Sequence, residues 1–193
     1  MLKKNIIFLL ICFVFQSCCT KVWFDKEEQR WYNMYSQGDI LIFKSNRLNL
    51  DTIKITEVKE IEPNGECNWI EISNFSKERV IITYQYTFDN KKWIEEDLFD
   101  FTKEDDDRFT IPFIKVKGLF VGYNLEDNLK KSKKDVYLFE IGEYSSTKYT
   151  KMKHGVDTDI VQFYWELDKG LVQYENNKGE VWELKEHIKA NGL

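Results

Sequence analysis

Side chains suited to acid–base or nucleophilic chemistry are sparse in this sequence. The two histidines, His154 and His187, have no cysteine or carboxylate at ligand spacing and lie in no nucleophile motif. His187 falls in a Lys/Glu-rich terminal stretch, so we expect it to be solvated. The sequence also lacks a glycine-rich phosphate loop, a dinucleotide fingerprint and a metal-binding helix motif. We therefore expect no catalytic residue, no cofactor and no enzymatic activity.

Carboxylates offer two weaker leads. The acidic run at residues 104–107 has oxygen ligands of the kind that calcium prefers, but it lacks the EF-hand spacing and a glycine for the sharp turn. Asp157 and Asp159 flank Thr158 in a similar way. We interpret both as solvated loops and expect no metal site. A pair of carboxylates acting as a glycoside hydrolase remains an alternative.

Cysteine thiols are the most informative reactive groups. Cys18, Cys19 and Cys67 follow a basic N-terminus and ten uncharged residues, 6–15. A basic start, an apolar run and a small residue before the cut are marks of a secretory signal. The apolar run is too short for a helix that spans a bilayer, which needs about 20 residues.

The segment Phe15-Gln16-Ser17-Cys18 resembles the lipobox of bacterial lipoproteins, where the signal is cut before a cysteine that then carries acyl chains. The resemblance implies a signal peptide over residues 1–17, lipid on Cys18 and a tether over residues 18–23. Several acyl chains give stable membrane anchoring. Residue 19 is not the Asp that retains lipoproteins in the inner membrane, so we expect the cell envelope, at the outer membrane. A plain secreted protein is the alternative.

Lipid on Cys18 would leave Cys19 and Cys67 as the pair of thiols that can form a disulfide in the mature chain. An oxidising compartment permits that bond. The alternative is a buried or capped Cys67. No Cys/His spacing suggests zinc.

Charge excludes one class of partner. Without the signal, the chain has 26 basic and 33 acidic residues and a net charge of about −7. Nucleic acids reward a basic surface, so we expect no nucleic-acid partner.

Aromatic residues are the best lead to a binding surface, because the chain has 6 Trp, 10 Tyr and 14 Phe. Most of them are expected to fill the core. Trp93 follows Lys91-Lys92 at the end of a predicted hairpin, so it is our candidate for an exposed binding aromatic. Exposed Trp side chains stack on sugars or anchor protein surfaces.

Period-two alternation predicts strands along most of the chain. The cleanest is 80–88, followed by Asp89-Asn90 turn chemistry and a return strand at Trp93-Ile94. Polar residues 124–134 predict a long loop. Glycines in the turns at 168–170 and 176–179 predict a C-terminal meander. Further strands are expected at 40–43, 53–55, 69–72, 109–116, 119–123, 136–141, 149–153, 160–165, 171–174 and 181–184.

The fold that follows is all-β, an antiparallel sandwich or barrel of about ten short strands. A short N-terminal helix is expected within 24–35, because Asp25 and Glu28 have capping-box spacing. Residues 24–193 form a single β-rich domain, since no linker or repeat divides them.

The terminal motif F-Y-W-E-L-D-K-G-L-V-Q-Y at 163–174, with G-E-V-W-E-L at 179–184, is similar to the closing hairpin of small uncharacterised lipoproteins from Bacteroidota. The resemblance covers about 22 residues and the lipoprotein start. It implies a bacterial, Gram-negative source and brings no known activity.

The preferred hypothesis is a membrane-tethered, non-enzymatic binding module that recognises a protein or a glycan. The alternatives are a lipocalin-like carrier of a small apolar ligand and the carboxylate-dependent hydrolase.

Overall fold

The computed structural model describes residues 20–63, 75–88, 92–103, 112–121, 130–133, 135–140 and 160–190. Several expectations from the sequence lie outside these ranges. They are the signal peptide, the thiols of Cys18, Cys19 and Cys67, the strands at 69–72 and 149–153, the acidic run at 104–107, His154, Asp157 and Asp159.

Strands dominate the described ranges. The N-terminal half contributes β1 (Thr20–Val22), β2 (Ile40–Ser45), β3 (Leu50–Ile61), β4 (Phe75–Lys77), β5 (Arg79–Phe88), β6 (Lys92–Thr102), β7 (Phe113–Val116) and β8 (Leu119–Val121). The C-terminal half contributes β9 (Lys130–Lys133), β10 (Val136–Glu140), β11 (Ile160–Glu166), β12 (Gly170–Asn176) and β13 (Val181–Ile188). The expected all-β class is confirmed.

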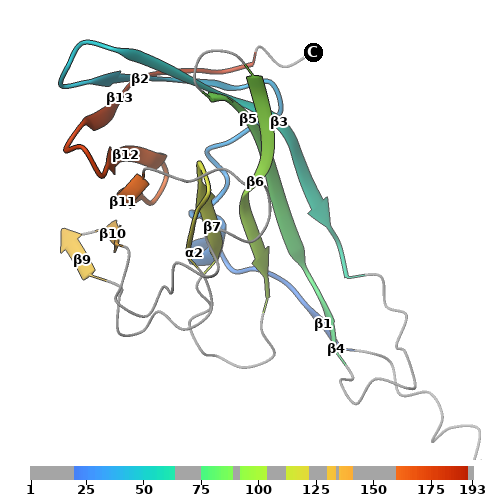
Figure 1. The fold of residues 1–193 in the computed structure, drawn as a ribbon. Coiled ribbons are helices and arrows are strands. Elements are labelled where there is room, and N and C mark those ends of the chain that lie inside the picture. Colours follow the sequence, from blue (N-terminus) through green and yellow to red (C-terminus); the bar gives the residue numbers. More distant parts are fainter. Residues whose placement is uncertain are drawn as a thin grey trace, which may run out of the picture.

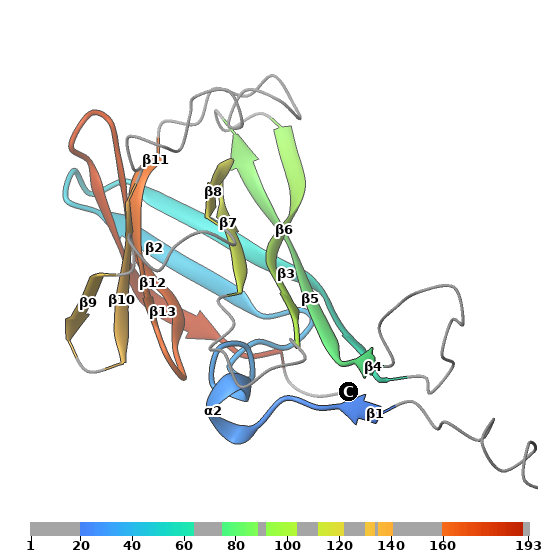
Figure 2. The same cartoon turned by 90° about the horizontal axis from the view of Figure 1, so that it is seen from below.

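Eleven of these strands form one antiparallel sheet in the order β8-β7-β6-β5-β3-β2-β13-β12-β11-β10-β9 (Figure 1). The sheet curls into a half-barrel, with β5–β8 on one side and β9–β12 on the other (Figure 2). Its first strand, β8, comes close to β11 across the interior. β1 and β4 form a separate parallel pair beside the start of β5.

Alternation along β5 produces the inner face of the curl, as the sequence predicts. Val80, Ile82, Tyr84 and Tyr86 are at most 1% exposed, whereas the residues between them are half-buried. Successive side chains of a strand point to opposite faces, so this pattern puts the aromatic and aliphatic groups inside. The predicted hairpin with β6 is confirmed, because Thr87 pairs with Trp93.

The C-terminal meander is also confirmed, since β10, β11, β12 and β13 pair in sequence order. Its turns use positive φ at Asp168, Gly170 and Gly179, with values of 68°, 80° and 68°. At Gly170 a Cβ atom would lie 2.1 Å from the Tyr35 hydroxyl oxygen. Glycine is therefore required there by contact as well as by backbone conformation.

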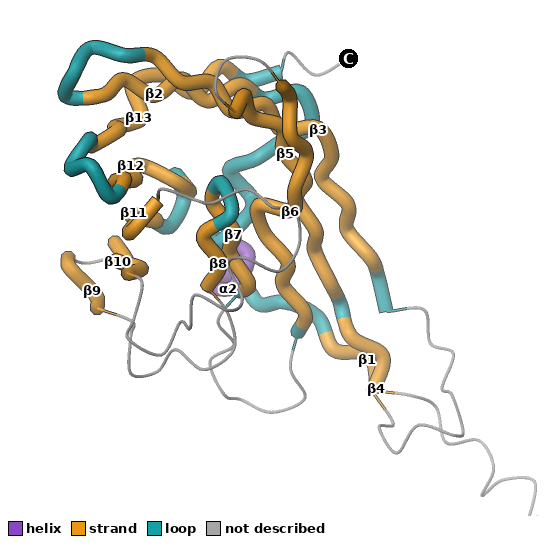
Figure 3. The backbone as a smooth tube through the Cα atoms, in the orientation of Figure 1, coloured by secondary structure: helices purple, strands orange, loops and turns teal. Residues whose placement is uncertain are grey.

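The short N-terminal helix, α2 (Lys26–Gln29), lies at one end of the half-barrel (Figure 2), behind β7 and β8 in the view of Figure 3. The expected capping box is present, because Asp25 accepts from the Glu28 amide and Glu28 accepts from the Asp25 amide. The helix is four residues long and ends well before Tyr35. Trp31 contacts Tyr137, and Tyr35 contacts Trp165.

The structure differs from the sequence-based expectations in three places. Thr20–Val22, expected within the tether, form β1 by pairing with β4. Lys130–Lys133, expected in a long loop, form the outermost strand β9, which pairs with β10. His187 is not solvated, because a register shift between Leu184 and Glu186 turns it to the same side as the buried Leu41, its partner across the sheet.

Candidate interaction surface

Three apolar side chains are unusually exposed at one end of the sheet: Leu48 at 75%, Leu50 at 70% and Trp93 at 53%. We call these three residues the tip surface. Leu48 lies in the turn between β2 and β3, and Leu50 begins β3. Trp93 lies near the start of β6, where the sequence places an exposed aromatic side chain; its binding role stays a prediction.

Strand register shows that Leu50 and Trp93 lie on the same outer face of the sheet and near the same end of it. Ile53 pairs with Tyr86 and Thr87 pairs with Trp93, so the outward positions Thr52, Thr87 and Trp93 form a row across three strands. Leu50 lies two residues before Thr52 and shares its face. At about 4.8 Å between strands and about 3.4 Å per residue, the Cα atoms of Leu50 and Trp93 are roughly 12 Å apart.

The turn that presents Leu48 is held by polar contacts. The Ser45 hydroxyl accepts from the amides of Arg47 and Asn49, each at 3.1 Å. Glu180, 8% exposed, accepts from Asn49 Nδ2 at 2.8 Å. A hydrogen bond from Ser45, with help from Asn49 and the nearby cations, overcomes burial and holds the pKa of Glu180 below its usual value.

Leu48 itself has a φ of 67°, a conformation that a leucine rarely adopts. The turn therefore holds an apolar side chain in water and in an unfavourable backbone conformation, and both features cost free energy. Strained and exposed positions of this kind gather at binding sites.

Basic side chains lie close to the two leucines. Lys44, the register partner of Leu50, is exposed, and so is Lys178. Arg47 is 53% exposed and donates to the Lys178 carbonyl at 2.9 Å. Three exposed cations, Lys44, Arg47 and Lys178, thus lie beside the two leucines, and Lys44 also pairs across the sheet with the exposed Glu183.

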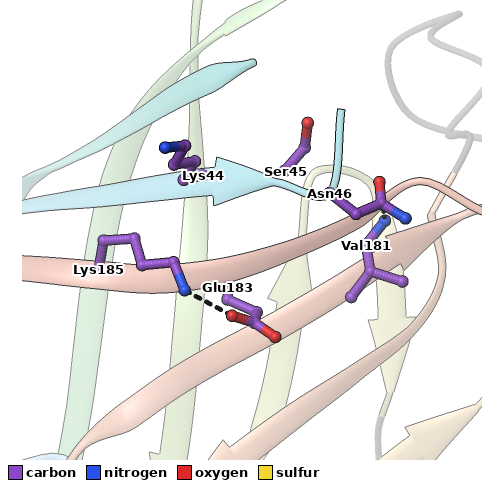
Figure 4. Close-up of a pocket in the computed structure, with 6 residues that line it drawn as sticks. All are labelled: Lys44, Ser45, Asn46, Val181, Glu183 and Lys185. Carbon is purple, nitrogen blue, oxygen red and sulfur yellow. Dashed lines mark hydrogen bonds and ion pairs between the residues drawn. The ribbon is translucent and has the colours of Figure 1, made fainter. Parts of the chain in front are cut away.

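A groove of about 290 Å³ adjoins the tip surface on β2 and β13 (Figure 4). Five of its six lining residues are polar or charged, and the Lys185 ammonium contacts the Glu183 carboxylate of the same strand at 2.5 Å. A groove of this size and polarity accommodates a polar side chain of a partner better than a drug-sized apolar ligand. It is lined by Lys44, Ser45, Asn46, Val181, Glu183 and Lys185.

Inside the curl, Asp51 and Lys117 form a buried ion pair. Their side chains are 8% and 15% exposed, and the Tyr174 hydroxyl also donates to Asp51. The Lys117 ammonium lies 5.3 Å from the ring centroids of both Tyr86 and Tyr174. Cation–π contacts of this kind favour a desolvated ammonium. The pair connects the β7–β8 turn with β3 and β12 on the other side of the interior.

A second buried carboxylate, Glu96, lies on the same inner face. Its side chain is 3% exposed and contacts the Lys115 ammonium at 3.0 Å. Gly118 N donates to it at 3.2 Å, and burial with the nearby Glu96 charge raises the pKa of Tyr84 well above 10. Asp51 and Glu96 therefore each have their own ammonium partner, an arrangement that satisfies charges inside a fold.

Asp39 and His187 form a third buried contact, with His187 Nε2 2.8 Å from Asp39 Oδ2. Asp39 is 0% exposed and also accepts from the amides of Ser36 and Ala190. Burial pushes the pKa of Asp39 up, but the hydrogen bonds from Ala190, His187, Ser36 and Lys189 outweigh it, so the pKa lies below 3.8. The cluster links β13 to the segment before β2.

Asp51-Thr52-Ile53 also matches a short O-glycosylation pattern of Bacteroidota, for which the start of a strand is the competing interpretation. The strand interpretation is confirmed, since all three residues lie in β3. Among the described residues, no group of histidine, cysteine and carboxylate side chains can hold a metal ion. Within the same ranges, no helix has the length and hydrophobicity needed to cross a bilayer.

Neither the exposure of the two leucines nor the buried ion pairs could be recognised in the sequence. Leu48 and Leu50 flank a polar turn residue and look like ordinary strand ends. Comparisons with family models, curated proteins and solved structures found no match for this chain.

Proposed function

We propose that this protein is a lipid-anchored, non-enzymatic interaction module of the bacterial envelope, tethered through Cys18 and binding a protein partner at the tip surface. One observation carries the proposal. The three most exposed large apolar side chains of the described residues gather at the end of the sheet opposite β1, through which the chain arrives from Cys18.

Strand length separates the two ends. β1 pairs with β4 just before Arg79, where β5 begins, and the tip surface lies where β5 ends, near Phe88. Ten residues of β5 at about 3.3 Å each span roughly 30 Å. A chain anchored next to β1 therefore offers its tip surface to molecules beyond the membrane surface rather than to its own lipid.

The side chains favour a protein over a glycan. Leucine has no hydrogen-bonding group for sugar hydroxyls, and burying each leucine in an apolar pocket stabilises a complex by about 1.5–3 kcal/mol. The cations beside the two leucines add complementarity to a partner with acidic residues around such a pocket. Trp93 alone suits stacking on a sugar, so a glycan is the second candidate.

Two measurements test the proposal. The anchor predicts that mass spectrometry of the mature protein finds an acylated Cys18 at the N-terminus, and an unmodified or differently cut N-terminus would refute it. For the surface, a photo-crosslinking amino acid is placed at position 48 in cells. Ile188 is the matched control site, because it is 41% exposed and lies at the opposite end of β13.

We expect a defined protein adduct at position 48 and none at position 188. With the crosslinking amino acid at position 93 instead, we expect an adduct that is lost in the Leu48→Ser/Leu50→Ser variant. Equal adducts at positions 48 and 188 would contradict a specific surface. An adduct that resists protease but is cleaved by periodate would identify the partner as a glycan instead of a protein.

A further inference from the structure

Trp23 is the one strongly exposed tryptophan at the anchor end of the described structure. Its side chain is 47% exposed, whereas the next residue, Phe24, is 5% exposed and stacks on Phe101 at 4.4 Å. The indole therefore points away from the core immediately after β1.

The backbone around Trp23 is fixed on both sides by one residue. Glu78 N donates to the Val22 carbonyl at 3.0 Å, and the Phe24 amide donates to Glu78 Oε2 at 2.6 Å. Glu78 is itself buried. Because both neighbours are held, the exposure of Trp23 is a property of the fold rather than of a loose end.

The distance to the lipid-bearing residue is short. Thr20 lies two positions after Cys18 and Trp23 lies five positions after it, so a fully extended chain places them within about 7 Å and 18 Å of Cys18. A bilayer of about 40–45 Å with a hydrocarbon core of about 30 Å has polar layers of roughly 5–7 Å on each side. When β1 lies along the surface, the Trp23 ring reaches that layer.

Lys21 strengthens the argument. It is exposed and lies in β1, two residues before Trp23. Alternation continued from β1 through the exposed Trp23 to the buried Phe24 puts the Lys21 and Trp23 side chains on the same side. Tryptophan and lysine are the residues that settle at membrane–water interfaces, the indole among headgroups and the ammonium towards phosphate. An exposed tryptophan and lysine beside a lipid anchor are therefore better suited to contact with a bilayer surface than to full exposure to water.

We propose that Trp23, with Lys21, lies in the headgroup layer of the anchoring membrane and orients the domain so that its tip surface points away from the bilayer. This inference rests on the proposed lipid anchor at Cys18. The occupant of the Trp23 surface is the lipid bilayer itself, and the contact fixes the orientation of the domain on the membrane.

The test uses the full mature lipoprotein labelled with 5-fluorotryptophan and reconstituted in nanodiscs of phosphatidylethanolamine and phosphatidylglycerol. The resonances of Trp23 and its matched control Trp93, which has a similar exposure of 53%, are assigned with Trp23→Phe and Trp93→Phe. Fluorine relaxation is compared with and without a lipid that bears gadolinium on its headgroup. Denaturant midpoints of both variants verify that each remains folded, and Trp23→Tyr replaces Trp23→Phe if it does not.

We expect the gadolinium lipid to enhance the relaxation of Trp23 at least fivefold more than that of Trp93. Equal enhancement of the two residues, or none at Trp23 in protein that copurifies with nanodiscs, would overturn the orientation. A Trp23 signal that changes with protein concentration without gadolinium would assign the surface to a second copy instead. Protein that fails to copurify with nanodiscs would refute the anchor, which is a separate result.

Discussion

Replacing Lys117 by methionine tests whether the buried ion pair with Asp51 holds the curl together. Methionine keeps most of the aliphatic stem and removes the charge. The carboxylate of Asp51, 8% exposed, then loses its ammonium partner inside the fold. Leaving one partner of a buried pair uncompensated costs about 3–5 kcal/mol.

The lower end of that range applies here. Lys117 is 15% exposed, so water partly reaches the site, and the Tyr174 hydroxyl still donates to Asp51. We expect Lys117→Met to lower the free energy of unfolding by about 3 kcal/mol, a large part of the roughly 5–15 kcal/mol that stabilises a typical domain. The corresponding fall in Tm is about 6–12 °C for a chain of this size.

Urea unfolding followed by tryptophan fluorescence measures the change, and a double-mutant cycle isolates the pair. Asp51→Asn in the Lys117→Met background removes the unpaired charge, so the double variant should recover about 2 kcal/mol relative to the sum of the single changes. Lys185→Met is the matched control, because its pair with Glu183 has side chains 49% and 56% exposed and should contribute less than about 1 kcal/mol. Additive single changes, or a Lys117→Met effect no larger than the control, would refute the reasoning.

Two further predictions concern a turn and an acidic group. Gly170→Ala should lower the free energy of unfolding by at least about 2 kcal/mol more than Gly179→Ala. Both glycines have positive φ, but a Cβ at position 170 would lie 2.1 Å from the Tyr35 hydroxyl oxygen, whereas a Cβ at position 179 would meet open space. Equal denaturant midpoints for the two variants would contradict the contact. Asp39 has a folded pKa below its ordinary 3.8, so it contributes stability above about pH 4 that is lost as the pH falls through the folded value. Asp39→Asn should therefore be less stable at pH 7 and should lose less stability below pH 4. Parallel stability curves from pH 7 to pH 3 would show that Asp39 does not contribute.

Most strands could be predicted from the sequence, because their cause is local. In β5, apolar side chains at every second position face the core whatever the partner strand is. The capping pair Asp25 and Glu28 and the glycine at position 170 act within a few residues. These features depend on covalent geometry and short-range hydrogen bonds, so they can be recognised in a single sequence.

Features that depend on distant segments could not be predicted. β2 pairs with β13, and this pairing with its register shift brings His187 to Asp39, 148 residues earlier in the chain. In the same way the curl brings Lys117 to Asp51. The alternation of apolar and polar residues shows which face of a strand a residue occupies, but it does not show which strand lies beside it.

The sequence by itself thus determined the strand content, the N-terminal cap, the turns of the meander and the expectation of a lipid anchor at Cys18. Only the tertiary structure decided that Leu48, Leu50 and Trp93 share one end of the sheet while Trp23 lies at the other. The physical reason is that exposure is a property of the whole surface. An apolar residue at a strand end is buried or exposed according to how the sheet curls, and that curl results from contacts between strands far apart in the chain.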